Sequence, residues 1–136
     1  MSRRSINSLL ASVVAFTAAA AIGLAIHNPS NRDGGRLETF QYEYDNGGLF
    51  QFFWNTRGND NAATLAALQR TGHDRHAELF ERAILAYEAE KSILQGAWTT
   101  FDDTRDVSVY SLAVERSAIP ALDAEWATLP SLTPQD

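Results

Sequence analysis

The chain contains no cysteine among its 136 residues. This absence excludes disulfide bonds, thiolate nucleophiles and cysteine-ligated zinc sites, and it leaves the redox compartment open. Serine-nucleophile, phosphate-loop and dinucleotide motifs are also missing, because the glycine pairs Gly34-Gly35 and Gly47-Gly48 lack the strand-to-helix context that such motifs require. We therefore expect a protein that is not an enzyme and that needs no cofactor.

Basic residues are scarce after the first 32 positions. All 17 acidic residues lie at or after Asp33, whereas three of the 11 basic residues precede it, so eight cations face 17 anions and residues 33–136 carry a net charge of −9. A domain this acidic repels nucleic acid, which argues against direct DNA or RNA binding. Its acidity either keeps a small protein soluble or presents carboxylates to a basic protein partner.

Charged side chains are absent from Leu9–Ile26, a mostly apolar run that follows Arg3 and Arg4. The run is close to the length of a membrane span, and small-x-small pairs near its end also suit a cleaved signal peptide. A third interpretation is a buried helix of the fold. We expect residues 1–27 to be an apolar N-terminal helix that anchors or exports the chain, with a cytoplasmic location as the alternative.

The remaining residues indicate one domain. Residues 28–35 are polar and rich in helix breakers, which predicts a linker. Pro130 and Pro134 mark residues 131–136 as a frayed tail. Helical spacing of apolar residues recurs over 36–130 without convincing strand alternation. The prediction is an all-α fold, a compact multi-helix domain preceded by the apolar N-terminal helix.

The first half of that domain is punctuated by glycine and asparagine. Leu37, Phe40 and Tyr44 share a helical face, and the run Asp45–Gly48 ends that helix. The aromatic run Leu49–Trp54 fits either a buried strand or a buried helix. After a loop at 55–59, Asn59 or Asp60 can cap a helix that Gly72 ends and whose shared face comprises Ala62, Leu65 and Leu68.

The second half contains the clearest periodicity. Asp74 can cap a helix with Ala77, Phe80, Ile84 and Tyr87 on one face, an ion pair between Glu78 and Arg82, and a break at Gly96. A loop at 102–106 then leads to a helix that carries Val109, Leu112 and Ala113. Ile119-Pro120 suits the first turn of a last helix, with Leu122, Trp126 and Leu129 as its buried face.

One polar and aromatic constellation, residues 44–55, stands out. Two glycines after a helix permit a tight turn, and amide side chains beyond them can bond the freed backbone groups. One interpretation is a rigid corner that contacts no ligand; the other is a binding site. The candidate binding residues are Glu43, Asp45, Asn46, Gly47, Gly48, Gln51, Asn55 and Asp60.

Two histidines three positions apart, His73 and His76, invite a metal interpretation because that spacing places both on one helical face. No distant third ligand accompanies them, and the stretch is rich in ordinary surface residues. We therefore interpret them as residues at a helix start and expect no metal.

At residues 46–55 the sequence resembles the DNA-mimic protein family, in the order Asn46, Gly47-Gly48, an aromatic position, Gln51, two aromatic residues and Asn55. The similarity continues to about residue 96 through Gly58, Leu65, Leu68 and Gly72, and Leu122–Trp126 looks like the family's late acidic and aromatic helix. The resemblance implies an all-helical fold, dimerisation and no catalysis. It also implies surface carboxylates that imitate DNA phosphates toward a basic, DNA-binding regulator; the alternative function is a membrane-anchored or exported interaction domain with an unknown partner.

Overall fold

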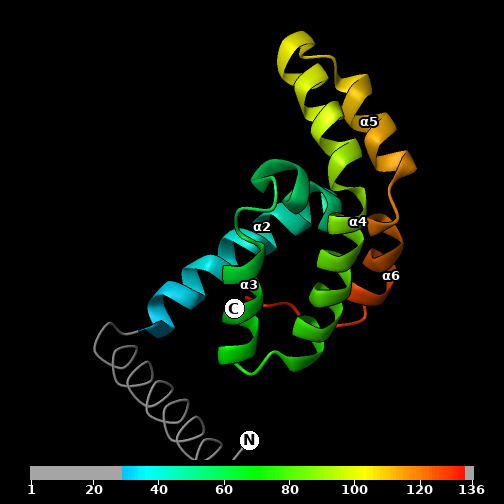
Figure 1. Ribbon diagram of the computed structural model, residues 1–136. Coiled ribbons are helices and arrows are strands. Elements are labelled where there is room, and N and C mark those ends of the chain that lie inside the picture. Colours follow the sequence, from blue (N-terminus) through cyan, green and yellow to red (C-terminus); the bar gives the residue numbers. More distant parts are fainter. Residues whose placement is uncertain (1–28, 134–136) are drawn as a thin grey trace, which may run out of the picture. The chain divides into compact units, whose positions relative to one another are not determined.

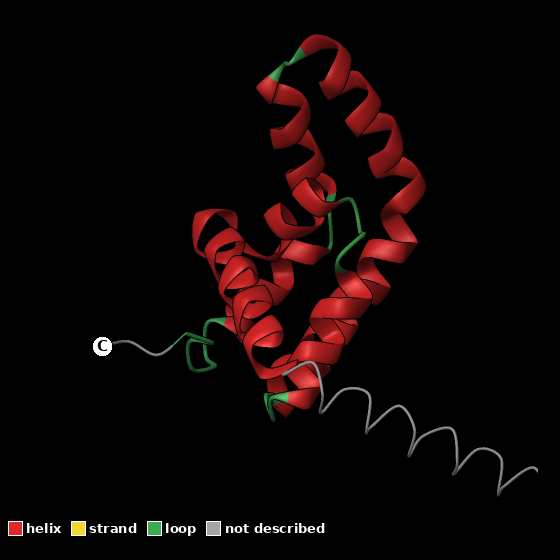
Figure 2. Ribbon diagram, turned by 90° about the vertical axis from the view of Figure 1, so that its left-hand side faces the viewer, coloured by secondary structure: helices red, strands yellow, loops and turns green. Residues whose placement is uncertain are grey.

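The computed structural model describes residues 29–133, and every regular element in that part of the chain is a helix (Figures 1 and 2). This confirms the all-α class for the described residues. The elements are α2 (Pro29–Thr56), α3 (Asn61–Arg70), α4 (Asp74–Thr104), α5 (Val107–Arg116), the 3-10 helix η1 (Ile119–Leu122) and α6 (Asp123–Trp126).

The predicted apolar segment Leu9–Ile26 lies outside the described residues, so its interpretation as anchor, signal or core helix stays a prediction. The chain divides into two units, 1–32 and 33–136, and the packing below concerns the second. Among the helices of residues 29–133, none combines the length and the hydropathy needed to cross a membrane.

The stretch predicted as a linker, residues 28–35, is helical from Pro29 onward. Proline is tolerated in a first helical turn because the N–H it lacks has no partner there. The breaker-rich composition is further offset by Asp33, which is buried and accepts two hydrogen bonds of 2.8 Å from the Arg70 guanidinium. A buried carboxylate requires such a partner, and this ion pair holds the start of α2 against the end of α3.

The ambiguous aromatic run Leu49–Trp54 is a helix, the second arm of α2 beyond Gly47 and Gly48. Five of its six residues are buried, with at most 7% of their surface exposed. A helix buried on nearly every side shows no amphipathic period, which is why periodicity could not separate strand from helix here.

The core is a cluster of aromatic rings contributed by α2, α4 and α6. Phe53 stacks between Phe80, at 5.8 Å between ring centroids, and Tyr87, at 5.1 Å. Phe40 meets Phe80 edge-on at 5.4 Å and lies 5.2 Å from Trp126. Because these rings come from distant parts of the sequence, they fix how the helices pack.

The buried face of α3 matches the predicted one in part, since Leu68 is buried and Leu65 packs against the core. Ala62 is exposed, whereas Asn61, Thr64, Ala67 and Leu68 are buried. Asn61 and Thr64 are polar, so the spacing of apolar residues could not predict their burial. Asp60 precedes the helix as expected, but its side chain makes no capping hydrogen bond.

The predicted break at Gly96 is wrong, since α4 continues through it to Thr104. Glycine costs about 1 kcal/mol in a helix interior relative to alanine, which tertiary burial easily outweighs. Leu94 and Trp98, on either side of Gly96, are 3% and 5% exposed and supply that burial. Helix α5 then runs antiparallel to this second half of α4 (Figure 1).

Arg82 does not pair with Glu78 as predicted. Its Nη1 instead donates to both carboxylate oxygens of Glu125 in α6, at 3.0 and 2.9 Å. This ion pair joins α4 to α6, between side chains that are both about half exposed. The predicted tail also packs in part, because the Leu132 N–H donates to Gln41 Oε1 at 3.2 Å and Leu132 is 8% exposed.

Candidate functional site

The corner between the two arms of α2 depends on two glycines for different reasons. Gly48 has φ of +74°, a backbone conformation that L side chains rarely adopt. A Cβ at this position would also overlap Oδ2 of Asp123. Gly47 has extended backbone at φ −166°, but its Cβ would overlap the Gln51 side chain. The sequence prediction of a stop at residues 45–48 is therefore confirmed.

The carboxylate of Glu43 ties the two arms together across the corner. Its Oε2 accepts hydrogen bonds from the Gln51 amide at 3.1 Å and from the Asn55 amide at 2.7 Å. Hydrogen bonds to an ionised acceptor are stronger than neutral ones, so this pair of contacts holds the arms at one angle. Glu43 lies on the first arm and both amides lie on the second.

Asp45 and Asn46 bond within the first arm. Asp45 Oδ1 accepts from the Gln41 amide at 2.7 Å, and the Asn46 amide donates to the Tyr42 carbonyl at 2.8 Å. Because Gln41 also accepts from the Leu132 N–H, it links the arm to the C-terminal residues. These bonds agree with the interpretation of residues 44–55 as a rigid corner.

Asp123, at the start of α6, completes the corner from a distant part of the chain. Its Oδ1 accepts a 2.9 Å hydrogen bond from the Leu49 N–H, a donor freed by the break in the helix. Burial raises the pKa of Asp123, while the Leu49 hydrogen bond opposes that rise. The role of Asp123 cannot be read from its sequence neighbours, because only the fold brings it to Leu49.

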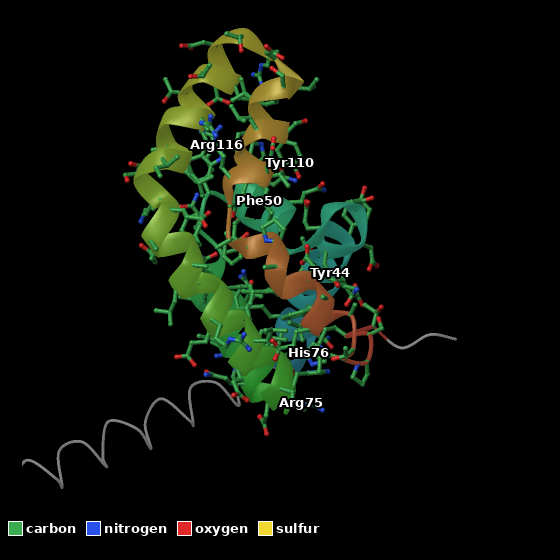
Figure 3. The ribbon with its side chains drawn as sticks, turned by 90° about the vertical axis from the view of Figure 1, so that its right-hand side faces the viewer. Tyr44, Phe50, Arg75, His76, Tyr110 and Arg116 are labelled. Atoms are coloured by element: carbon green, nitrogen blue, oxygen red, sulfur yellow. The ribbon has the colours of Figure 1, made fainter. Side chains whose placement is uncertain are left out.

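Aromatic side chains also pack around the corner. Tyr44 lies 5.7 Å from Trp126 between ring centroids, and Tyr110 of α5 lies 5.7 Å from Phe50. Figure 3 shows Tyr110 beside Phe50, with Tyr44 further along α2. Burial raises the pKa of Tyr44 and of Tyr110, and the Asp123 carboxylate adds to both shifts.

Seven of the eight candidate binding residues thus belong to the corner, and Asp60 stands apart from them. Its carboxylate lies 3.5 Å from the Arg36 guanidinium, and no hydrogen bond or ion pair of residues 29–133 joins it to the corner. Whether any of the eight contacts a partner stays a prediction.

Most cations of the domain are already neutralised within it. Five basic residues, Arg36, Arg57, Arg70, Arg82 and Lys91, form ion pairs with Asp60, Asp102, Asp33, Glu125 and Glu88. By contrast, six exposed carboxylates make no side-chain hydrogen bond or ion pair within the part of the chain that the structure describes. They are Glu38, Asp74, Glu78, Glu81, Asp103 and Glu115.

The rings of the two histidines lie 5.6 Å apart between centroids, but their hydrogen-bond partners differ. His76 is 5% exposed and its Nε2 lies 2.8 Å from the Pro130 carbonyl, whereas His73 Nδ1 lies 2.7 Å from Thr71 Oγ1. Since a carbonyl oxygen only accepts, Nε2 of His76 carries the proton. Residues 29–133 contain no group of three or more side chains placed to hold a metal ion.

His76 makes the stability of the domain depend on pH. Burial lowers its pKa, His73 and Arg75 act in the same direction, and the Pro130 contact opposes them. The unfolded chain therefore binds a proton more readily, so stability is full at neutral pH and falls as the pH drops below about 6.5. We expect this loss in urea unfolding at a series of pH values.

A comparison with His76→Gln isolates that contribution, because glutamine can still donate to the Pro130 carbonyl and does not titrate. As the pH falls from 7.5 to 5, the unfolding free energy of the native chain should decrease relative to that of the variant. The raised pKa of Asp123 has the opposite effect, because it stabilises the folded state as the pH falls. Both proteins contain Asp123, so its contribution cancels in the comparison. Parallel curves would contradict the assignment to His76.

These features define a small all-helical domain built on a hydrogen-bonded glycine corner, with an aromatic core and an excess of unpaired surface carboxylates. Compared with known families, the chain matches DMP19-like protein over residues 28–134. It therefore belongs to the DMP19-like protein family, which confirms the resemblance to DNA-mimic proteins at the level of the family. No curated protein and no solved structure matches the chain.

Proposed function

We propose that this domain is a non-enzymatic, acidic protein-binding module that occupies the DNA-binding surface of a basic protein. The observation that carries the proposal is the imbalance of charge, −9 over residues 33–136, together with the internal pairing of five of the eight cations there. Internal pairing leaves the excess negative charge on side chains that face solvent. Such a field attracts a basic surface and speeds encounter with it.

Membership of the DMP19-like family supports the proposal that the surface carboxylates imitate phosphates. A DNA-binding protein recognises the regular negative charge of the backbone without reading sequence from it. On α4, Asp74, Glu78 and Glu81 follow each other at helical spacing, which places successive carboxylates about 6 and 4.5 Å apart along the axis. This row is the part of the surface that we assign to the partner's basic groove.

The corner residues have a supporting role in this proposal. The polar groups of the corner bond to each other and to the backbone, as in the contacts of Glu43, Gln51, Asn55 and Asp123. They join the two arms of α2 and connect the second arm to α6.

The test begins with capture of DNA-binding proteins on the immobilised full-length chain, from a host-cell fraction that binds a heparin column. A captured protein is identified by mass spectrometry, purified and titrated with the chain. We expect a DNA duplex carrying that protein's own site to displace the chain, and affinity to fall about tenfold or more between about 50 and 200 mM salt. Affinity that is insensitive to salt, or that DNA does not compete for, would reject the proposal.

Two charge-matched variants then locate the surface. Glu78→Gln/Glu81→Gln and Glu38→Gln/Glu115→Gln each remove two negative charges from exposed side chains without a partner among the described residues. The first should weaken binding the more, because it interrupts the row on α4. Equal losses would mean that total charge, and not the row on α4, governs binding.

A further inference from the structure

Helix α5 has an apolar surface that the domain leaves partly uncovered. Val109, Tyr110, Ala113 and Val114 pack against the core but stay partly exposed, and none of the ten residues of α5 is fully buried. Val107 is 73% exposed and Leu112 is 43% exposed. An amphipathic helix is normally held in place by burial of its apolar face, so this exposure points to a covering element.

A groove of about 480 Å³ runs between α5 and the second half of α4. Its apolar lining comes from both helices: Ile93, Leu94, Ala97, Val109, Leu112 and Ala113. Ile93 is 70% exposed, which continues the uncovered surface onto α4.

Gly96 lies in this groove and is not required there by the fold of its own chain. It sits in the interior of α4, where glycine is the poorest residue apart from proline. A Cβ added at Gly96 would meet no atom within 4 Å. Glycine at such a position suits the close approach of a backbone from outside the domain.

The two ends of the groove offer different polar side chains. Since α4 and α5 are antiparallel, Arg116 marks one end. The other end is the loop 105–106, preceded by Asp102 and Asp103 in the last turn of α4. Arg116 forms no ion pair among residues 29–133, while Glu90 beside it is occupied by hydrogen bonds of 2.6 Å from Ser117 Oγ and the Ala118 N–H. A bound helix is accommodated best with its negative C-terminus at Arg116 and its positive N-terminus at the loop.

We infer that the groove between α4 and α5 binds a basic amphipathic helix of the partner protein, with the apolar stripe of that helix on the groove and its C-terminus toward Arg116. This inference rests on the proposed function and assigns it a second contact, apolar where the first is ionic. The net charge of −9 over residues 33–136 favours a basic occupant, because the field of the domain attracts positive charge. Apolar anchors at helical spacing are the usual means by which a helix occupies such a groove.

The probe is a labelled peptide of about 14 leucine and lysine residues in amphipathic order, long enough to form a helix on binding. Its affinity for the full-length chain is measured by fluorescence anisotropy at about 150 mM salt, where long-range attraction is screened. Two control peptides are used, one with the same composition in an order that gives no helical stripe, and one with glutamate in place of lysine. Binding of either control as tightly as the probe would overturn the inference.

The decisive variant is Gly96→Leu, which fills the groove without disturbing the helix. It should fold at least as stably as the native chain, yet bind the probe about tenfold or more weakly. Gly35→Leu is the matched control, since Gly35 also has no atom within 4 Å of an added Cβ and lies in another helix. Equal probe affinity of the native chain and Gly96→Leu would overturn the inference.

Two further outcomes separate this inference from the proposed function. If Gly96→Leu still binds the captured DNA-binding protein with unchanged affinity, the groove inference fails and the acidic module stands. If the probe binds in the groove but DNA does not compete with the captured protein, the proposed function fails and the groove site stands. A native dimer that Gly96→Leu converts to monomer in sedimentation analysis would assign the groove to a second copy and overturn the basic helix.

Discussion

Gly48→Ala is expected to destabilise the domain by about 2–5 kcal/mol. The left-handed φ of +74° costs an alanine about 1–3 kcal/mol, and overlap of the new Cβ with Asp123 adds a similar amount. Urea unfolding followed by tryptophan fluorescence measures the loss. A change below about 0.5 kcal/mol would mean that the corner relaxes freely and that its geometry does not organise the fold.

Two companion variants identify the source of that loss. Gly35→Ala, in an ordinary helical position with free space around it, should stabilise the protein by about 0.5–1 kcal/mol. In Gly48→Ala/Asp123→Ala the overlap is removed, while the backbone strain and an unpaired Leu49 N–H remain. A coupling energy between the two substitutions therefore measures the overlap separately from the strain.

The second large effect is expected at Phe80, which is fully buried and touches the rings of Phe40, Phe52 and Phe53. Phe80→Ala should cost about 3–5 kcal/mol, because it combines lost burial with a cavity among rigid rings. That is a large fraction of the 5–15 kcal/mol that holds a typical domain together. Thermal and urea unfolding should both register it.

Leu85→Ala is the matched control on the same helix, since Leu85 is 67% exposed. It should change the unfolding free energy by no more than about 0.5 kcal/mol. If the two alanine variants were equally stable, the arrangement of α4 with Phe80 inward and Leu85 outward would be incorrect.

Features governed by neighbours in sequence were predictable. The helical class, the stop at Gly47-Gly48 and the helix end at Gly72 all follow from local backbone preferences, and the structure places them as expected. The buried positions Phe40, Phe80 and Tyr87 follow from helical spacing. In each case the deciding physics acts within one or two turns of the chain.

Features governed by distant residues were not predictable. Arg82 prefers Glu125 of α6 over its helical neighbour Glu78, and Asp123 supplies the acceptor that Leu49 needs. Gly96 is a poor helix former, yet the burial of side chains around it outweighs its local cost. These contacts depend on which helices pack together, and the local sequence pattern does not determine that packing.

The hydrogen bonds that hold the corner and the first arm of α2 also determine which parts of the fold can form first during synthesis. The Leu49 N–H finds its acceptor 74 residues later, and Gln41 receives the Leu132 N–H 91 residues later. A ribosome releases Asp123 and Leu132 after α2 and α4, so the rings of those helices emerge before the residues that close over them. We expect the nascent chain to expose aromatic surface during that interval, and a chain truncated before Asp123 to aggregate instead of forming a smaller folded domain.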